Sequence, residues 1–245
     1  MMKNKIGNLY KRFSVYFYYT ARPHYVNPIW IIRKLNEISA RKKIRNHKIL
    51  WGHLGSLVTL SQSTGCEFPD YLELYDTVIR QKPKYILELG SGISSCVIAS
   101  ALKELGDEAG HEAFFVSMEE DPYYHDHIQD IFPHELKPYV TFIRSDRKEK
   151  MYGDLIGCYY ENIPDHPYDF VFIDGPTLRT SSTAPKCFNG DFINIAKKSN
   201  HSIFGILDQR IGTFWALRKL MPNARIRYHP IKKLTFIKTS VSSTL

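Results

Sequence analysis

The chain has 245 residues, which is enough for one well-buried domain and rather few for two. Its hydrophobic fraction of 43% and aromatic fraction of 13% are those of a globular protein and exclude a disordered one. The formal net charge of +8 favours acidic partners in a general way. The excess of bases lies mainly between Lys3 and Lys48, where Glu37 is the single acid. The basic character therefore belongs to the N-terminal segment and says little about the chemistry of the rest.

The sequence contains no motif typical of a zinc knuckle or a redox dithiol, and no segment typical of a membrane span. Its four cysteines are widely scattered and no two of them have a CxxC spacing. A reducing compartment is therefore the better expectation. No apolar run reaches membrane-spanning length, and bases interrupt the N-terminus where a secretory signal would need a continuous apolar core. We expect a cytoplasmic protein, with peripheral contact to a membrane as an additional expectation.

Residues 1–68 are expected to form a basic, aromatic-rich helical extension, and residues 69–245 the main domain. Within the extension, a helix is predicted from Pro28, with an apolar stripe at Ile29, Ile32, Leu35 and Ile38. The favoured interpretation is that this stripe packs on the core of the main domain. The alternative is that the helix lies on a membrane surface or contacts an acidic partner.

From residue 69 onward the pattern alternates between helix and strand. Helices are predicted over residues 69–81, 94–105, 124–131, 191–198 and 213–221. Strands are predicted over residues 85–89, 113–118, 140–144, 168–173, 202–207, 225–229 and 234–238. Ser94 and Ser95 are candidate N-caps of the helix that begins there.

This alternation predicts a doubly wound, Rossmann-like α/β fold with a mostly parallel seven-stranded sheet covered on both faces. The last two strands are joined by a connection too short for a helical crossover, so they should form an antiparallel C-terminal hairpin. In such sheets ligands bind beyond the carboxyl ends of the strands. The informative residues should therefore follow each strand directly.

The first strand leads into Glu88-Leu89-Gly90-Ser91-Gly92. Two glycines allow a tight turn and let a ligand lie against backbone amides. Dinucleotide-binding enzymes prefer GxGxxG, and here Ser95 stands at the third glycine position.

The second strand ends in Glu119, with Glu120 as a one-residue alternative. A carboxylate at this position can accept both hydroxyls of a ribose. Asp174-Gly175-Pro176 follows the fourth strand, where it is also a turn signal, and Asp208-Gln209 closes the fifth.

Between Pro69 and Lys238 these motifs, taken in order, resemble class I S-adenosylmethionine-dependent methyltransferases. The acid two positions before the first glycine matches their (D/E)xGxG motif, and the pattern is most similar to the catechol O-methyltransferase-like, small-molecule O-methyltransferases. The resemblance implies that S-adenosylmethionine is held by a set of strand-end residues: Glu88, Gly90, Ser91, Gly92, Ser94, Glu119, Asp146 and Asp174. Asp146 stands where family members bond the adenine, although it could equally be a helix N-cap.

The same resemblance implies catalytic roles for Asp174 and Asp208, with Asp174 as a metal ligand or a base. In the metal-dependent members the matching residues hold Mg²⁺, and here the set would be Asp174, Asp208 and Gln209. Two departures put this metal site in doubt. Gln209 replaces an asparagine, and the lysine that follows the first metal aspartate in that group has no match in Asp-Gly-Pro-Thr.

We therefore expect methylation of a hydroxyl on a small-molecule or glycan acceptor. A nucleic-acid substrate is not expected, because the (D/N)PPY motif of the nucleic-acid amino methyltransferases is absent. An NAD(P)-dependent oxidoreductase and a non-catalytic binding protein on the same scaffold are the alternatives. The patterns give no prediction of the oligomeric state.

Overall fold

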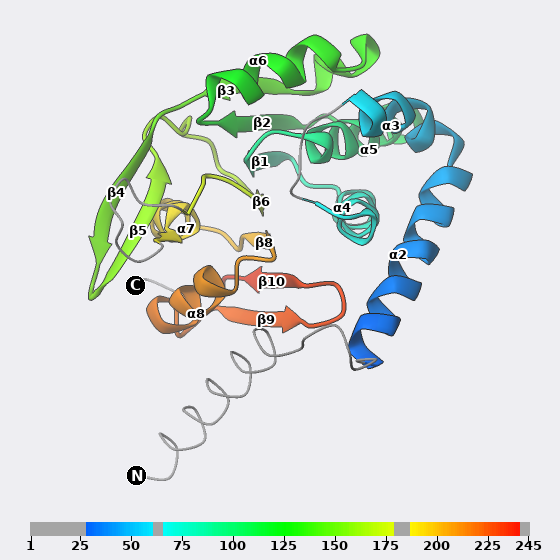
Figure 1. The fold of residues 1–245 in the computed structure, drawn as a ribbon. Coiled ribbons are helices and arrows are strands. Elements are labelled where there is room, and N and C mark those ends of the chain that lie inside the picture. The colour runs from blue at the N-terminus through cyan, green and yellow to red at the C-terminus, as the bar shows by residue number, and fades with distance from the viewer. Residues whose placement is uncertain (1–27, 61–65, 179–186, 241–245) are drawn as a thin grey trace.

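The computed structural model describes residues 28–60, 66–178 and 187–240, so the aromatic-rich stretch of the predicted extension lies outside them. Its centre is a seven-stranded sheet in the order β3-β2-β1-β6-β8-β10-β9 (Figure 1). The strands are β1 (Tyr85–Leu89), β2 (Phe114–Glu119), β3 (Thr141–Arg144), β6 (Phe170–Ile173), β8 (Phe204–Asp208), β9 (Arg225–His229) and β10 (Leu234–Lys238).

The direction of the strands confirms the predicted fold. The strands β3, β2, β1, β6 and β8 pair in parallel, whereas β10 is antiparallel to both β8 and β9. The order reverses beside β1, between β2 and β6. In open parallel sheets, such a reversal is where loops from neighbouring strands diverge and leave room for a ligand.

Helices cover both faces of this sheet. They are α4 (Phe68–Gln81), α5 (Ile93–Ala109), α6 (Pro122–Ile131), α7 (Asp191–Lys198) and α8 (Ile211–Leu220), with a 3₁₀ turn η1 (His134–Tyr139). Because successive side chains of a strand point to opposite faces, Ile86 belongs to the core under α4 and α5, and Leu87 to the core under α7 and α8. The two cores explain why the central strands are apolar without alternation.

A second, three-stranded sheet was not predicted. It consists of β4 (Arg147–Tyr152), β5 (Leu155–Tyr160) and the short β7 (Phe188–Asn189), in the order β4-β5-β7. Tyr152, Tyr160 and Phe188 of this sheet join the core under α7 and α8. Most of β4 is charged and solvent-exposed, so its sequence lacks the apolar signal of a buried strand.

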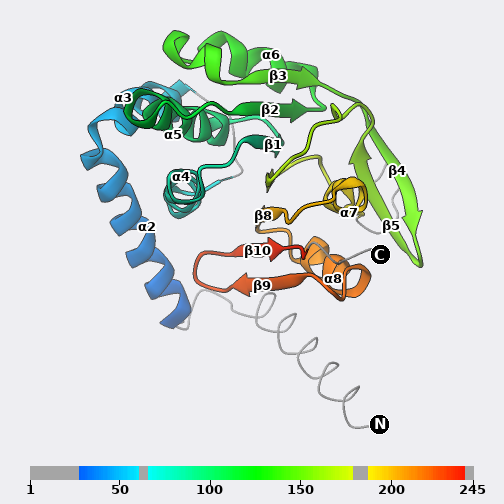
Figure 2. The same ribbon diagram turned by 180° about the vertical axis from the view of Figure 1, so that it is seen from behind.

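Two helices precede the main domain, α2 (Pro28–Asn46) and α3 (Lys48–Leu60). The helix predicted from Pro28 is confirmed, but the prediction that its apolar stripe packs on the core is wrong. Leu35 and Ile38 are 60% and 62% exposed, whereas Ala40 and Ile44 are the buried residues of α2. In both views α2 and the β4–β5 hairpin lie at opposite ends of the molecule (Figures 1 and 2).

The predicted caps of α5 need correction. The N-cap is Gly92, and Ser94 and Ser95 lie inside the first turn, where Ser95 Oγ accepts a hydrogen bond from the Gly92 amide. Among the described residues no helix combines the length and apolarity needed to cross a membrane. The division between residues 68 and 69 stays a prediction.

Candidate active site

The turn after β1 makes backbone contact with the loop after β6. Gly90 has a φ of 98°, a conformation that favours glycine. A Cβ at Gly90 would lie 2.6 Å from the amide nitrogen of Gly175. Residues with side chains at these two positions would push the loops apart. Both glycines are therefore needed for the close contact between the two loops, and not only for the turn.

Glu88 is fully buried beneath this turn. Its Oε2 accepts hydrogen bonds from the hydroxyls of Ser95 and of Ser117, the latter at 2.6 Å, while its Oε1 has no hydrogen-bond partner among the described residues. Burial raises the pKa of Glu88 to about 7, against the opposing effect of the serine hydroxyls. The buried and unpartnered oxygen is the kind of atom that a cationic ligand would complement.

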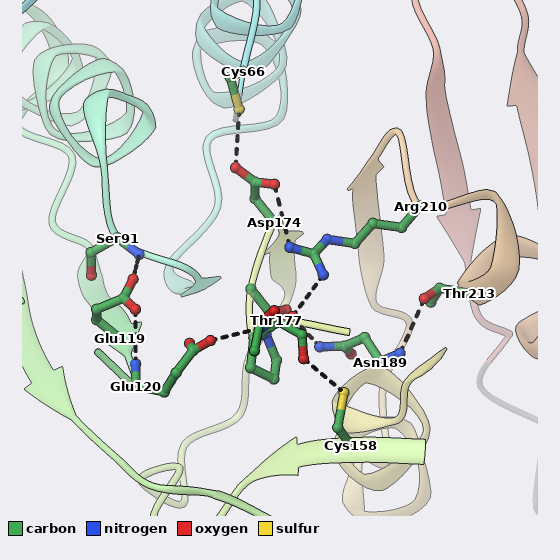
Figure 3. Close-up of polar contacts among 12 residues, drawn as sticks. Cys66, Ser91, Glu119, Glu120, Cys158, Asp174, Thr177, Asn189, Arg210 and Thr213 are labelled. Carbon is green, nitrogen blue, oxygen red and sulfur yellow. Dashed lines mark hydrogen bonds and ion pairs between the residues drawn. The ribbon is translucent and has the colours of Figure 1, made fainter. Parts of the chain in front are cut away.

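Glu119, at the end of β2, reaches back to the glycine turn. Its Oε2 accepts a hydrogen bond from the Ser91 amide at 3.1 Å, and its Oε1 accepts the amides of Glu120 and Asp121 at 3.0 Å each (Figure 3). Burial and the neighbouring Glu120 carboxylate raise its pKa to about 8. Since a carboxylate oxygen has two acceptor positions, Oε2 can still accept a ligand hydroxyl.

Glu120, the alternative to Glu119, accepts hydrogen bonds from other parts of the protein through both of its carboxylate oxygens. Its Oε2 accepts the Tyr160 hydroxyl at 2.7 Å and its Oε1 accepts the Thr177 amide at 2.6 Å. It thus joins the end of β5 to the loop after β6. Of the two acids, Glu119 is the one that lies against the glycine turn.

Asp146 follows β3 and has an exposed side chain. The alternative that it caps a helix is wrong, because the strand β4 begins at Arg147. Its neighbour Ser145 is buried and accepts the Asn162 amide at 3.0 Å. The end of β3 is therefore ordered by Ser145, with Asp146 facing outward.

Asp174 emerges from β6 between a cation and a thiol (Figure 3). Its Oδ1 lies 3.6 Å from Arg210 Nη2, and its Oδ2 accepts a long hydrogen bond from Cys66 Sγ at 3.6 Å. Burial raises the pKa of Asp174, and the Arg210 guanidinium opposes this effect. The carboxyl group is thus held within reach of two polar groups at the centre of the strand ends.

The three residues that follow Asp174 are each fixed by a different side chain. Asn189 Nδ2 donates to the Gly175 carbonyl at 2.7 Å, and Arg210 Nη1 donates to the Pro176 carbonyl at 2.7 Å. Glu120 accepts the amide of the third residue, as described above. These anchors come from β7, from the start of α8 and from the end of β2, and Figure 3 shows them converging.

Asp208 ends β8 and is only 3% exposed. Within the described ranges its Oδ1 has no hydrogen-bond partner, and burial together with the Asp174 and Asp70 charges raises its pKa to about 9. The next residue, Gln209, has a φ of 35° and its amide donates to the Lys233 carbonyl. The structure thus brings Asp174 and Asp208 to neighbouring strand ends, as predicted.

The sequence-based reasoning missed Cys66 and Asp70. Cys66 precedes α4 and Asp70 lies in its first turn, and one donor atom each of Cys66, Asp70 and Asp208 lies within 4.8 Å of the others. The sequence places Asp70 in a predicted helix start, and its Oδ2 accepts the Glu67 amide in a capping box. No local pattern signals a contact between residues 138 positions apart in the chain.

Comparison with known proteins finds similarity to methyltransferases. Residues 87–187 match a family model described as a methyltransferase domain. The structure of a candidate caffeoyl-CoA O-methyltransferase from Staphylococcus aureus superposes with a TM-score of 0.50 at 14% identity, covering 84% of this chain and 99% of that one. An O-methyltransferase from Bacillus cereus, solved with S-adenosylhomocysteine, gives a TM-score of 0.44 at 17% identity over 82% and 89% of the two chains.

A comparison with curated protein sequences finds no match. The family model covers the segment from β1 to the start of β7, which contains the glycine turn, Glu119 and Asp174. The superposition extends the agreement in fold to most of the chain. Residues 87–187 are therefore similar to a methyltransferase domain, and the fold of the chain is that of the Staphylococcus aureus structure.

Proposed function

We propose that the protein transfers a methyl group from S-adenosylmethionine to a hydroxyl group of a small-molecule or glycan acceptor. The observation that carries this proposal is the convergence of three acids on one edge of the sheet. Glu88 lies beneath the glycine turn, Glu119 bonds to the turn, and Asp174 lies at the end of the adjacent strand. This arrangement complements a ligand that carries an amino acid, a ribose and a cationic sulfur.

In this proposal the cofactor lies across the turn after β1. Gly90, Ser91 and Gly92 form the turn against which the cofactor would lie, and Ser94 lies in the first turn of α5, whose N-terminus carries partial positive charge. Glu119 would accept the ribose hydroxyls through its free acceptor position. Asp146 would bond the adenine, which its exposed position at the end of β3 leaves it able to do.

S-adenosylmethionine supplies the methyl group as part of a sulfonium, which is a good leaving group in an in-line displacement. The chain's own task is to orient the acceptor oxygen and to take up its proton. Asp174 is the proposed base, because its carboxyl group lies at the strand end and burial raises its pKa, which makes the carboxylate a stronger base than a free aspartate. Asp208, on the adjacent strand, would support it.

The predicted Mg²⁺ set of Asp174, Asp208 and Gln209 remains a proposal, and two contacts weigh against it. The Asp174 carboxylate is engaged by both Arg210 and Cys66. A methyl-transfer assay with and without excess EDTA decides whether any divalent cation is required. Full activity in EDTA would rule out a metal role in the reaction.

Calorimetry with S-adenosylhomocysteine and with NADH tests the class of ligand. We expect binding of the first alone, and binding of NADH alone would favour the oxidoreductase alternative. A screen of hydroxyl compounds and glycans with isotopically labelled S-adenosylmethionine, read by mass spectrometry, then tests the acceptor class. A protein that binds S-adenosylhomocysteine but whose biological role survives Asp174→Ala would be the non-catalytic alternative.

We also propose that α2 contacts an anionic lipid surface, as a peripheral protein in the cytoplasm. Its apolar stripe is exposed, and Lys34, Lys42 and Lys43 add positive charge to the same helix. Amphipathic helices of this composition bind at the interface of anionic membranes. The charge of α2 is what favours a lipid surface over an apolar protein partner.

A further inference from the structure

The donor atoms at the junction of α4 and β8 have the spacing of a metal site that differs from the predicted one. Cys66 Sγ and one carboxylate oxygen each of Asp70 and Asp208 lie within 4.8 Å of one another. Two of the donors come from the segment that leads into α4, and the third from the end of β8. Gln209 is not part of this set.

Asp208 gives an independent indication that something binds there. Only 3% of the Asp208 surface is exposed to solvent, and its Oδ1 has no hydrogen-bond partner in the described part of the chain. A buried polar atom without a partner is costly and rare in native proteins. Asp70 is equally buried, and its Oδ2 accepts the Glu67 amide.

The chemistry of the three donors selects the cation. Mg²⁺ prefers oxygen ligands alone, whereas a thiolate with two carboxylates suits a borderline cation such as Zn²⁺. Three protein ligands are the number found in zinc sites that keep a fourth position open. We propose that Cys66, Asp70 and Asp208 form a binding site for a divalent cation of the zinc class, with one position open toward the strand ends.

Binding would require the Cys66 thiol to lose its proton. The thiol donates to Asp174 Oδ2 at 3.6 Å, so a proton acceptor is already in contact with it. The balance is one proton released from sulfur and one metal–sulfur bond formed, with no change of oxidation state. The site therefore needs no co-reactant, and it does not depend on methyl transfer.

Cobalt(II) substitution of the full-length protein provides the test, because a cobalt–thiolate bond produces a charge-transfer absorption in the near ultraviolet. We expect one Co²⁺ or Zn²⁺ per chain, with the thiolate band present in the wild type and absent in Cys66→Ser. Zn²⁺ affinity should fall by at least about 100-fold in Cys66→Ser and in Asp70→Asn. Mg²⁺ should not displace bound Co²⁺.

Cys187→Ser is the matched control, since Cys187 is buried elsewhere and should leave the band unchanged. Circular dichroism and S-adenosylhomocysteine binding of each variant separate loss of metal from loss of fold. A wild-type protein that binds no Zn²⁺ or Co²⁺ would overturn the proposal. So would a thiolate band that survives Cys66→Ser, or one that disappears in Cys187→Ser. Because the absorption requires no acceptor, these outcomes are distinct from failure of the proposed methyl transfer.

Discussion

Gly90 and Gly175 approach each other so closely that neither position has space for a side chain. A Cβ at Gly175 would lie 2.6 Å from Gly90 Cα and 2.5 Å from the Tyr160 hydroxyl. The two glycines follow adjacent parallel strands, β1 and β6. The contact therefore fixes the distance between the proposed cofactor turn and the proposed catalytic loop.

Replacement of Gly175 by alanine should damage both stability and ligand binding. The added methyl group would have to displace backbone atoms, so we expect a loss of about 1–3 kcal/mol in the free energy of unfolding and weaker S-adenosylhomocysteine binding. Thermal unfolding and calorimetry measure the two effects. Gly212→Ala is the control, because no atom of the described residues lies within 4 Å of its added Cβ and alanine favours the helix. Equal behaviour of the two variants would contradict the importance of the contact.

The affinity for S-adenosylhomocysteine should rise with pH. The pKa of Glu88 is raised to about 7 by burial, and a ligand ammonium group favours the charged carboxylate. Binding then releases a proton from Glu88, so affinity increases as pH rises through 7 and falls by up to about tenfold per unit below it. Calorimetry from pH 6 to 8 measures this.

Glu88→Gln should remove the increase in S-adenosylhomocysteine affinity that occurs as the pH rises toward 7. A smaller rise between pH 7 and 8 should remain, since the pKa of Glu119 is raised to about 8. An unchanged pH profile in Glu88→Gln would show that the charge of this carboxyl group does not affect ligand binding.

Glu119→Gln should weaken cofactor binding without unfolding the protein. The amide keeps one acceptor oxygen, so either the Ser91 amide or the amides of Glu120 and Asp121 lose their acceptor, and it lacks the charge that strengthens hydrogen bonds from ribose hydroxyls. We expect a loss of about 10- to 100-fold in S-adenosylhomocysteine affinity. Asp121→Asn is the control, because its Oδ1 only accepts the Tyr123 amide at the start of α6. Similar affinities for the two variants would argue against Glu119 as the ribose ligand.

Asp174→Asn separates catalysis from cofactor binding. The substitution preserves shape but removes the proposed proton acceptor, so kcat should fall by about 100-fold or more while the affinity for S-adenosylhomocysteine changes little. Single-turnover methyl transfer and calorimetry measure the two quantities. If kcat were retained, the acceptor proton would have to leave by another route.

The exposed stripe of α2 should bind anionic vesicles. Leu35→Ser and Ile38→Ser together should abolish sedimentation with vesicles that contain phosphatidylserine, because both side chains are more than half exposed. Ile211→Ser, at an exposed apolar residue of α8, is the control. Binding to neutral vesicles with equal affinity would contradict the role of the lysines. Binding that survives the double substitution would contradict the role of the stripe.

The central sheet could be predicted because its signals are local. Each buried strand is a short apolar run, and the residue that follows it in sequence also follows it in space, as Glu119 and Asp174 do. The hairpin of β9 and β10 followed from the length of its connection alone. For these elements, periodicity and chain connectivity contain the needed information.

The parts that were missed depend on contacts between distant segments. The strand β4 is charged and exposed, and only its pairing with β5 makes it a strand. The stripe of α2 was assigned to the core because apolar residues at helical spacing usually pack inward, yet α2 packs through Ala40 and Ile44. Asp70 enters the site through the placement of α4, which no local pattern encodes.

The residues after Asp174 are held by three side chains from three separate elements, and Thr177 is fixed in this way although its side chain is exposed. A surface loop usually loses conformational entropy when a ligand orders it, and that loss weakens binding. Here the segment becomes ordered when the protein folds, before any acceptor binds. We therefore expect this segment to contribute little entropic penalty to acceptor binding, so that selectivity at this edge depends on fit to a pre-formed surface.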